Sequence, residues 1–224
     1  MRTAVRLLIG ALATASLVVV IAGQAVLAAP AAGACQLQGT AHLSPGLAST
    51  SQAFTYDFTG NLTGCQSNVA GAPATGVASA GVQVPETVTL TNSTGGTTTG
   101  TVQYQEPLPS GSGSCGSSTT SGQSLSQWAD GTNTVVAYTT SGSGPAVALV
   151  GTVQPSMTLS LVASSVPAGW TAPATFTIAT TRFAAGNSAV APLTFSPTDT
   201  SQNCATVPVT SASINGVVSI GTAS

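Results

Sequence analysis

Alternating apolar and polar residues form a series of short runs after about residue 35, and Gly, Pro, Ser and Asn separate these runs. The clearest run is AFTYDFTG, in which Phe54, Tyr56 and Phe58 alternate with polar residues. A period of two places the three rings on one face of an extended chain. The run therefore predicts a β-strand whose aromatic face is turned toward the core.

Similar runs recur to the end of the chain, at VQVPETVTLT, TGTVQYQEP, PAVALVGTV, SMTLSLVAS, PATFTIATTR and SINGVVSIG. The stretch SLSQWADGTNTVVAYTT predicts a hairpin with Asp130 and Gly131 in a type I′ turn. The Gly- and Ser-rich segment 107–122 is expected to be a loop. Because none of these runs has a helical period, the pattern predicts an all-β fold. An immunoglobulin-like or jelly-roll β-sandwich of about ten strands would bury them.

The first residues follow a different pattern. Arg2 and Arg6 precede the apolar run LLIGALATASLVVVIAG, and small residues follow it. These three parts are typical of a secretory signal peptide. Cleavage is expected after Ala28, Ala29, Ala32 or Ala34. The expected organisation is a signal peptide with its helix over residues 1–34, followed by a disulfide-stapled β-sandwich domain over residues 35–224.

The charged residues of the chain limit the classes of partner that it could bind. Loss of the signal peptide leaves Arg182 alone against five acidic side chains, and the chain contains no lysine. Nucleic-acid binding needs several Lys or Arg side chains to neutralise phosphates, so it is excluded. Charged residues make up 4% of the chain, against about 25% in an average soluble domain. The surface is therefore expected to consist of hydroxyl and amide groups, and no stable membrane anchor is expected.

Four cysteines in an exported chain predict two disulfides. Folding CQLQGTAHL against AFTYDFTGNLTGC as a hairpin brings Cys35 near Cys65, which leaves Cys115 to pair with Cys204. The alternative is a lipid anchor on Cys35, although Ala32 stands where a lipid-attachment box normally has Leu. The chain is thus expected to be secreted and extracellular, or else lipid-anchored through Cys35. No metal or other cofactor is expected, since no cysteines have C-x-x-C spacing and His42 is the only histidine.

The blocks ACQLQGTAHLSPG, QAFTYDFTGNLTGCQS, YQEPLPSGSGSC, WADGTNTVVAYTT and TTRFAAG, together with the late cysteine, resemble small exported proteins of actinobacteria. The resemblance covers nearly the whole mature chain. It implies export, disulfides and an all-β mature domain. That family carries no established activity, so the resemblance assigns no functional residue.

Candidate chemistry is sparse. A hydrolytic triad would have to use His42, and no G-x-S-x-G elbow is present. Glu86 and Glu106 lie on neighbouring predicted strands and could form a glycosidase pair. Exposed aromatic rings could stack on sugars, and the candidates for that role are Trp170, Trp128 and Tyr104.

No catalytic residue is assigned on these grounds. The leading hypothesis is a non-enzymatic, extracellular interaction or structural protein that acts at or near the cell envelope, with an unknown extracellular or cell-wall partner. The alternative is a carbohydrate-binding module, for which a polysaccharide would be the partner. A glycoside hydrolase ranks third.

Overall fold

The computed structural model describes residues 32–222, which form an all-β structure with one short 3-10 turn. The all-β class predicted from the pattern is confirmed. The predicted immunoglobulin-like or jelly-roll sandwich needs correction. The larger sheet closes on itself into a barrel of eight strand positions, and a second sheet extends from it. The predicted signal peptide covers residues 1–34, of which residues 1–31 lie outside the described residues. Gly33 and Ala34 are described, and they begin a β-strand instead of ending a helix.

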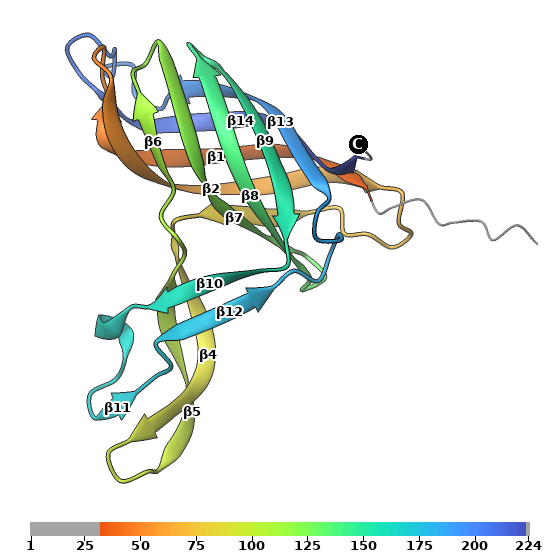
Figure 1. Cartoon of the computed structure of the whole chain (residues 1–224), viewed down its shortest axis with the longest axis vertical. Coiled ribbons are helices and arrows are strands. Elements are labelled where there is room, and N and C mark those ends of the chain that lie inside the picture. Colours follow the sequence, from red (N-terminus) through yellow and green to blue (C-terminus); the bar gives the residue numbers. More distant parts are fainter. Residues whose placement is uncertain (1–31, 223–224) are drawn as a thin grey trace, which may run out of the picture.

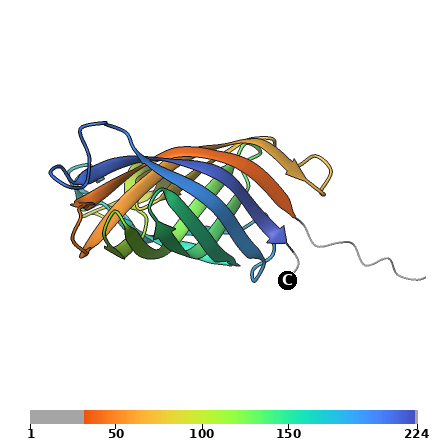
Figure 2. The same ribbon diagram turned by 90° about the horizontal axis from the view of Figure 1, so that it is seen from above.

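The barrel is a closed antiparallel sheet in which the first strand pairs with both the second and the last (Figures 1 and 2). Its long strands are β1 (Gly33–Leu47), β2 (Gln52–Ser67), β7 (Ser117–Trp128), β8 (Asn133–Ser143), β9 (Ala146–Gln154), β13 (Ser188–Pro197) and β14 (Val209–Thr222). The short strands β3 (Gly76–Ala80) and β6 (Ser110–Gly113) share the remaining position, each filling part of the space between β2 and β7. Closure leaves no unpaired edge around this ring.

The second sheet leaves the barrel at two points and projects from it (Figure 1). Its strands, in spatial order, are β11 (Trp170–Thr171), β4 (Gln83–Asn92), β5 (Thr97–Gln105), β10 (Ser156–Leu161) and β12 (Thr175–Ala179), and the 3-10 turn η1 spans Ala163–Ser165. The β4–β5 hairpin is inserted between β3 and β6, and the segment from β10 to β12 between β9 and β13. The core of this sheet packs against Leu125 and Val135 on the outer face of the barrel.

Strand alternation makes the barrel interior apolar. On β2, Phe54, Tyr56 and Phe58 face inward, as the pattern predicted. On the same strand Asp57 faces outward, where its carboxylate lies 2.8 Å from the ring of the exposed His42 on β1. Because every second residue of each barrel strand faces inward, residues far apart in the sequence can line one shared space.

Two disulfides join Cys35 to Cys65 and Cys115 to Cys204, which is the pairing favoured from the sequence. The register of β1 and β2 accounts for the first, since Ala34 lies opposite Gln66 in that hairpin. The Cys35 sulfur is engaged in this bond instead of standing free for a lipid. Two disulfides fit an extracellular protein.

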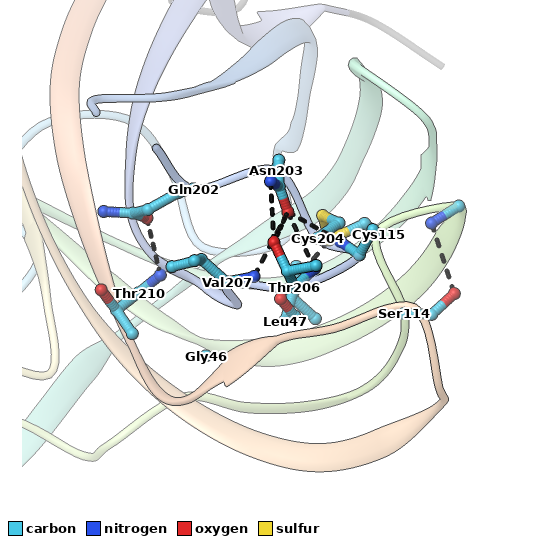
Figure 3. The surroundings of a disulfide bond; sticks show 12 residues. Gly46, Leu47, Ser114, Cys115, Gln202, Asn203, Cys204, Thr206, Val207 and Thr210 are labelled. Carbon is cyan, nitrogen blue, oxygen red and sulfur yellow. Dashed lines mark hydrogen bonds between the residues drawn. A yellow bond between two sulfur atoms is a disulfide. The ribbon is translucent and has the colours of Figure 1, made fainter. Parts of the chain in front are cut away.

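The second disulfide ties together two loops at one end of the barrel (Figure 3). Cys115 lies between β6 and β7, and Cys204 lies between β13 and β14. The Cys115 backbone N–H donates to the carbonyl of Ala48 at 3.0 Å. The side-chain oxygen of Asn203 accepts hydrogen bonds from the backbone N–H groups of residues 205–207. The loop that carries Cys204 is therefore held both by the disulfide and by its own polar contacts.

Two local predictions are wrong. In the β7–β8 turn, Gly131 alone of the described turn residues has a positive φ, of 80°, whereas a type I′ turn needs positive φ at two residues. Asp130 instead accepts hydrogen bonds from the backbone and side chain of Thr132. The segment 107–122 is not simply a loop, because it contains β6 and the beginning of β7. Its strands pair on both sides within the barrel, and this pairing overrides their low β-propensity.

Candidate functional site

The barrel interior contains a cavity of about 150 Å³. Most of its lining is aliphatic or aromatic and comes from β1, β2, β3, β8, β9, β13 and β14. These residues are Leu37, Ala41, Leu43, Leu47, Phe54, Phe58, Leu62, Ala78, Ala80, Val136, Val147, Leu149, Ala189, Leu193, Phe195, Ile214, Val218 and Ile220. No charged side chain lines the cavity within the described part of the chain. The cavity is thus suited to an apolar, uncharged ligand.

One wall of the cavity is polar. The cavity-lining residues of β7 are Ser118, Thr120, Ser124 and Ser126, and all of them carry hydroxyl groups. The neighbouring β8 adds Thr140. A stripe of hydroxyls therefore runs along one side of an otherwise apolar space.

Two phenols meet this stripe inside the barrel. The hydroxyl oxygens of Tyr56 on β2 and Tyr138 on β8 lie 2.6 Å apart. The Tyr56 hydroxyl also lies 3.1 Å from the hydroxyl of Thr120, which in turn lies 2.7 Å from that of Thr140. We call Tyr56, Thr120, Tyr138 and Thr140 the hydroxyl cluster. It links three strands by hydrogen bonds that cross the barrel interior.

Burial keeps the two phenols of this cluster protonated. Desolvation raises the pKa of Tyr56, and hydrogen bonds from Thr120 and Tyr138 offset only part of that rise. Desolvation also raises the pKa of Tyr138, and the adjacent Tyr56 raises it further. Both phenols are therefore neutral hydrogen-bonding groups at physiological pH. They can orient a polar atom of a ligand, but they supply no charge.

Two aromatic rings pack together near the Cys35–Cys65 disulfide. The rings of Trp128 and Phe183 meet edge to face with their centroids 6.0 Å apart, and a small cavity of about 20 Å³ lies beside them and Cys35. The Arg182 guanidinium lies 5.9 Å from the centroid of the Trp128 ring and forms an ion pair with Asp130. These contacts hold the three side chains together. We call Trp128, Arg182 and Phe183 the plug.

Two of the three residues proposed as sugar-stacking platforms have buried rings, and the third is half-buried. Trp128 is buried in the plug, and its indole N–H donates to Thr134 at 2.9 Å. Tyr104 is fully buried in the second sheet, where its hydroxyl donates to the carbonyl of Pro173. Trp170 is half-buried and packs against the core of the same sheet. The rings of Trp128 and Tyr104 therefore fill cores, as large aromatic side chains commonly do.

The proposed acidic pair does not enter the cavity. Glu106 is buried where the links to the second sheet leave the barrel, and its carboxylate accepts hydrogen bonds from Ser79 at 2.5 Å and from the Val82 backbone at 3.1 Å. Desolvation raises its pKa. Glu86 is half-buried on β4, where desolvation likewise raises its pKa. Glu86, Glu106 and His42 are not among the residues that line the barrel cavity.

The hydroxyl cluster was missed at the sequence level. Tyr56 was assigned to an inward face, but its meeting with Tyr138 depends on closure of the barrel. The β7 stretch offered no usable period of two, because hydroxyl residues stand at odd positions 117, 119 and 121 as well as at even ones. Only the pairing of β7 within the barrel decides which of these hydroxyls face the cavity.

No family model, curated protein or solved structure matches this chain. Within residues 32–222, no helix has the length and apolar character needed to cross a membrane. The same residues contain no group of three or more His, Cys, Asp or Glu side chains placed to hold a metal ion.

Proposed function

We propose that this protein binds a small, uncharged and largely apolar molecule inside its barrel, as a non-enzymatic extracellular binding protein. The observation that carries the proposal is the cavity of about 150 Å³ inside the barrel, with its apolar lining and neutral hydroxyl cluster. Barrels of eight strands are of the size that either fills with side chains or holds one small ligand. A cavity of this volume is large enough for a molecule such as benzene.

The size of the inward side chains supports a binding role. Small residues, such as Ala78 and Ala189, line the space where larger apolar residues would fill it. A ligand seated there would bury apolar surface and stabilise the folded state.

Export to the extracellular side remains part of the proposal, and the two disulfides support it. A non-enzymatic role is supported by the lining itself. The described lining contains no carboxylate, imidazole or thiol that could act as an acid, base or nucleophile. The buried positions of Trp128 and Tyr104 give no support to a carbohydrate-binding surface.

Toluene is a suitable first probe for the cavity. Titration into the oxidised protein should raise Tm, because a ligand that binds only the folded state stabilises it by mass action. Ala189→Leu places a larger side chain inside the cavity and should abolish the rise in Tm. Ala148→Leu is the matched control, since Ala148 is exposed on β9. An equal Tm rise in both variants, or none in the unmodified protein, would contradict the proposal.

A further inference from the structure

The hydroxyl cluster holds more hydrogen-bond donors than it uses. Its four hydroxyl groups, from Tyr56, Thr120, Tyr138 and Thr140, form three hydrogen bonds with one another. Each hydroxyl carries one proton, and each hydrogen bond consumes one. Within the cluster, one O–H group is therefore left without an acceptor, whichever way the hydroxyls rotate.

The surplus donor stands beside the cavity, because all four residues line it. Inside an apolar space, a donor without an acceptor costs free energy. A ligand that brings one acceptor oxygen into the cavity would satisfy it. Oxygens of the cluster also have free lone pairs, so a ligand hydroxyl could both donate and accept there.

The lining sets the charge of that ligand. No Lys, Arg or His side chain among the described residues lines the cavity, so a carboxylate would enter without a counter-ion. Burial of an unpaired charge is far costlier than burial of a neutral polar group. The two phenols cannot balance the charge of a carboxylate, because a phenol carries no positive charge. Their raised pKa values also keep them from becoming anions.

We propose that the hydroxyl cluster selects ligands that carry one uncharged oxygen acceptor, such as a ketone, aldehyde, ester or alcohol oxygen, on an otherwise apolar body. This inference rests on the proposed binding function and names its ligand class. The apolar wall formed by β1, β13 and β14 receives the hydrocarbon part. The hydroxyl cluster receives the oxygen and sets its position.

Cumene, acetophenone and benzoate test the inference, because they share a ring and a branched substituent of similar shape. Calorimetric titration should show binding of cumene and acetophenone, and at least tenfold weaker binding of benzoate. The variant Tyr56→Phe/Thr120→Val/Tyr138→Phe/Thr140→Val removes every cluster hydroxyl with little change of shape. This variant should bind acetophenone about five- to tenfold more weakly than the unmodified protein does. Its affinity for cumene should be unchanged or higher.

Matched controls separate the site from general effects of losing a hydroxyl. Tyr104→Phe removes the buried phenol of the second sheet, and Thr139→Val removes an exposed hydroxyl from β8. Neither should change the affinity for any of the three probes. If the fourfold variant does not fold, infrared spectroscopy of the unmodified protein provides the test. The carbonyl band of bound acetophenone should lie at lower frequency than the band of acetophenone in hexane, because a hydroxyl of the cluster donates to the carbonyl oxygen.

The outcomes distinguish the two proposals. Suppose that cumene and acetophenone both bind, and that the fourfold variant lowers the affinity for both equally or for neither. The selectivity inference then fails while the binding function stands. Benzoate that binds as tightly as acetophenone would also overturn the inference, as would a bound carbonyl band at the frequency that acetophenone shows in hexane. If no probe binds the unmodified protein, the binding function itself fails.

Discussion

Gly39 on β1 lies directly opposite Gly60 on β2, and both glycines face the barrel interior. The ring of Phe58 occupies the space that side chains at these positions would need. A Cβ atom at Gly39 would lie 2.7 Å from that ring and 2.5 Å from the Thr59 carbonyl oxygen. The pair of glycines thus allows the Phe58 ring to pack closely against the backbone of β1 and β2.

We expect Gly39→Ala to lower the free energy of unfolding by about 1–3 kcal/mol, because the new methyl group meets backbone as well as the Phe58 ring. Urea denaturation would measure the change. Gly116→Ala is the control, since the nearest atom to a Cβ there is 3.7 Å away. That substitution should stay within about 0.5 kcal/mol of the unmodified protein. Equal losses at the two sites would show that crowding is not the cause.

Phe183 in the plug adopts a left-handed backbone conformation, with a φ of 65°. Its replacement by Ala removes the ring contact with Trp128, which contributes about 0.5–1.5 kcal/mol beyond simple burial. Phe183→Gly removes the same ring but tolerates this φ at little cost. We therefore expect the Gly variant to be about 1 kcal/mol more stable than the Ala variant. Thermal unfolding of both variants gives the comparison, and a less stable Gly variant would argue against the left-handed conformation.

The two disulfides close loops of different length. The sequence separation is 89 residues for Cys115–Cys204 and 30 for Cys35–Cys65. Chain entropy in the unfolded state predicts losses of about 4.6 and about 3.6 kcal/mol when the respective pairs are replaced by alanine. Denaturant unfolding of the two double-alanine variants measures both values. A larger loss for the shorter loop would indicate that native contacts at the barrel end dominate over chain entropy.

Glu106 should make stability depend on pH. Its pKa is raised by desolvation, so the folded state binds a proton at higher pH than the unfolded state, where a Glu pKa is about 4.3. Between these two pKa values the folded state holds more protons, and the free energy of unfolding falls as pH rises. Glu106→Gln should therefore show a smaller decrease than the unmodified protein between about pH 5 and about pH 7.

The control for this prediction lies on the barrel exterior. Asp57→Asn alters an exposed carboxylate beside His42 and should leave the unfolding free energy nearly unchanged at neutral pH, since exposed ion pairs contribute little. If Glu106→Gln and the unmodified protein lose stability in parallel as pH rises, Glu106 is not the group responsible.

Much of the strand content was readable from local pattern. The face of β2 that carries Phe54 and Phe58 points inward as its alternation indicated, because a period of two assigns faces without knowledge of the partner strands. The hairpin that joins Cys35 to Cys65 is also local, since one turn sets the register of its two strands. Burial of Trp128 and Tyr104 was harder to assign, because composition does not distinguish an aromatic ring in a core from one on a surface.

The sequence by itself determined the all-β class, the inward face of β2 and the proximity of Cys35 to Cys65, because each depends on residues close together along the chain. Only the tertiary structure decided that the sheet closes. Closure depends on the pairing of β1 with β14, the two ends of the barrel sheet in sequence. That long-range pairing creates the interior, brings Tyr56 within 2.6 Å of Tyr138, and turns the hydroxyl face of β7 toward apolar residues from distant strands.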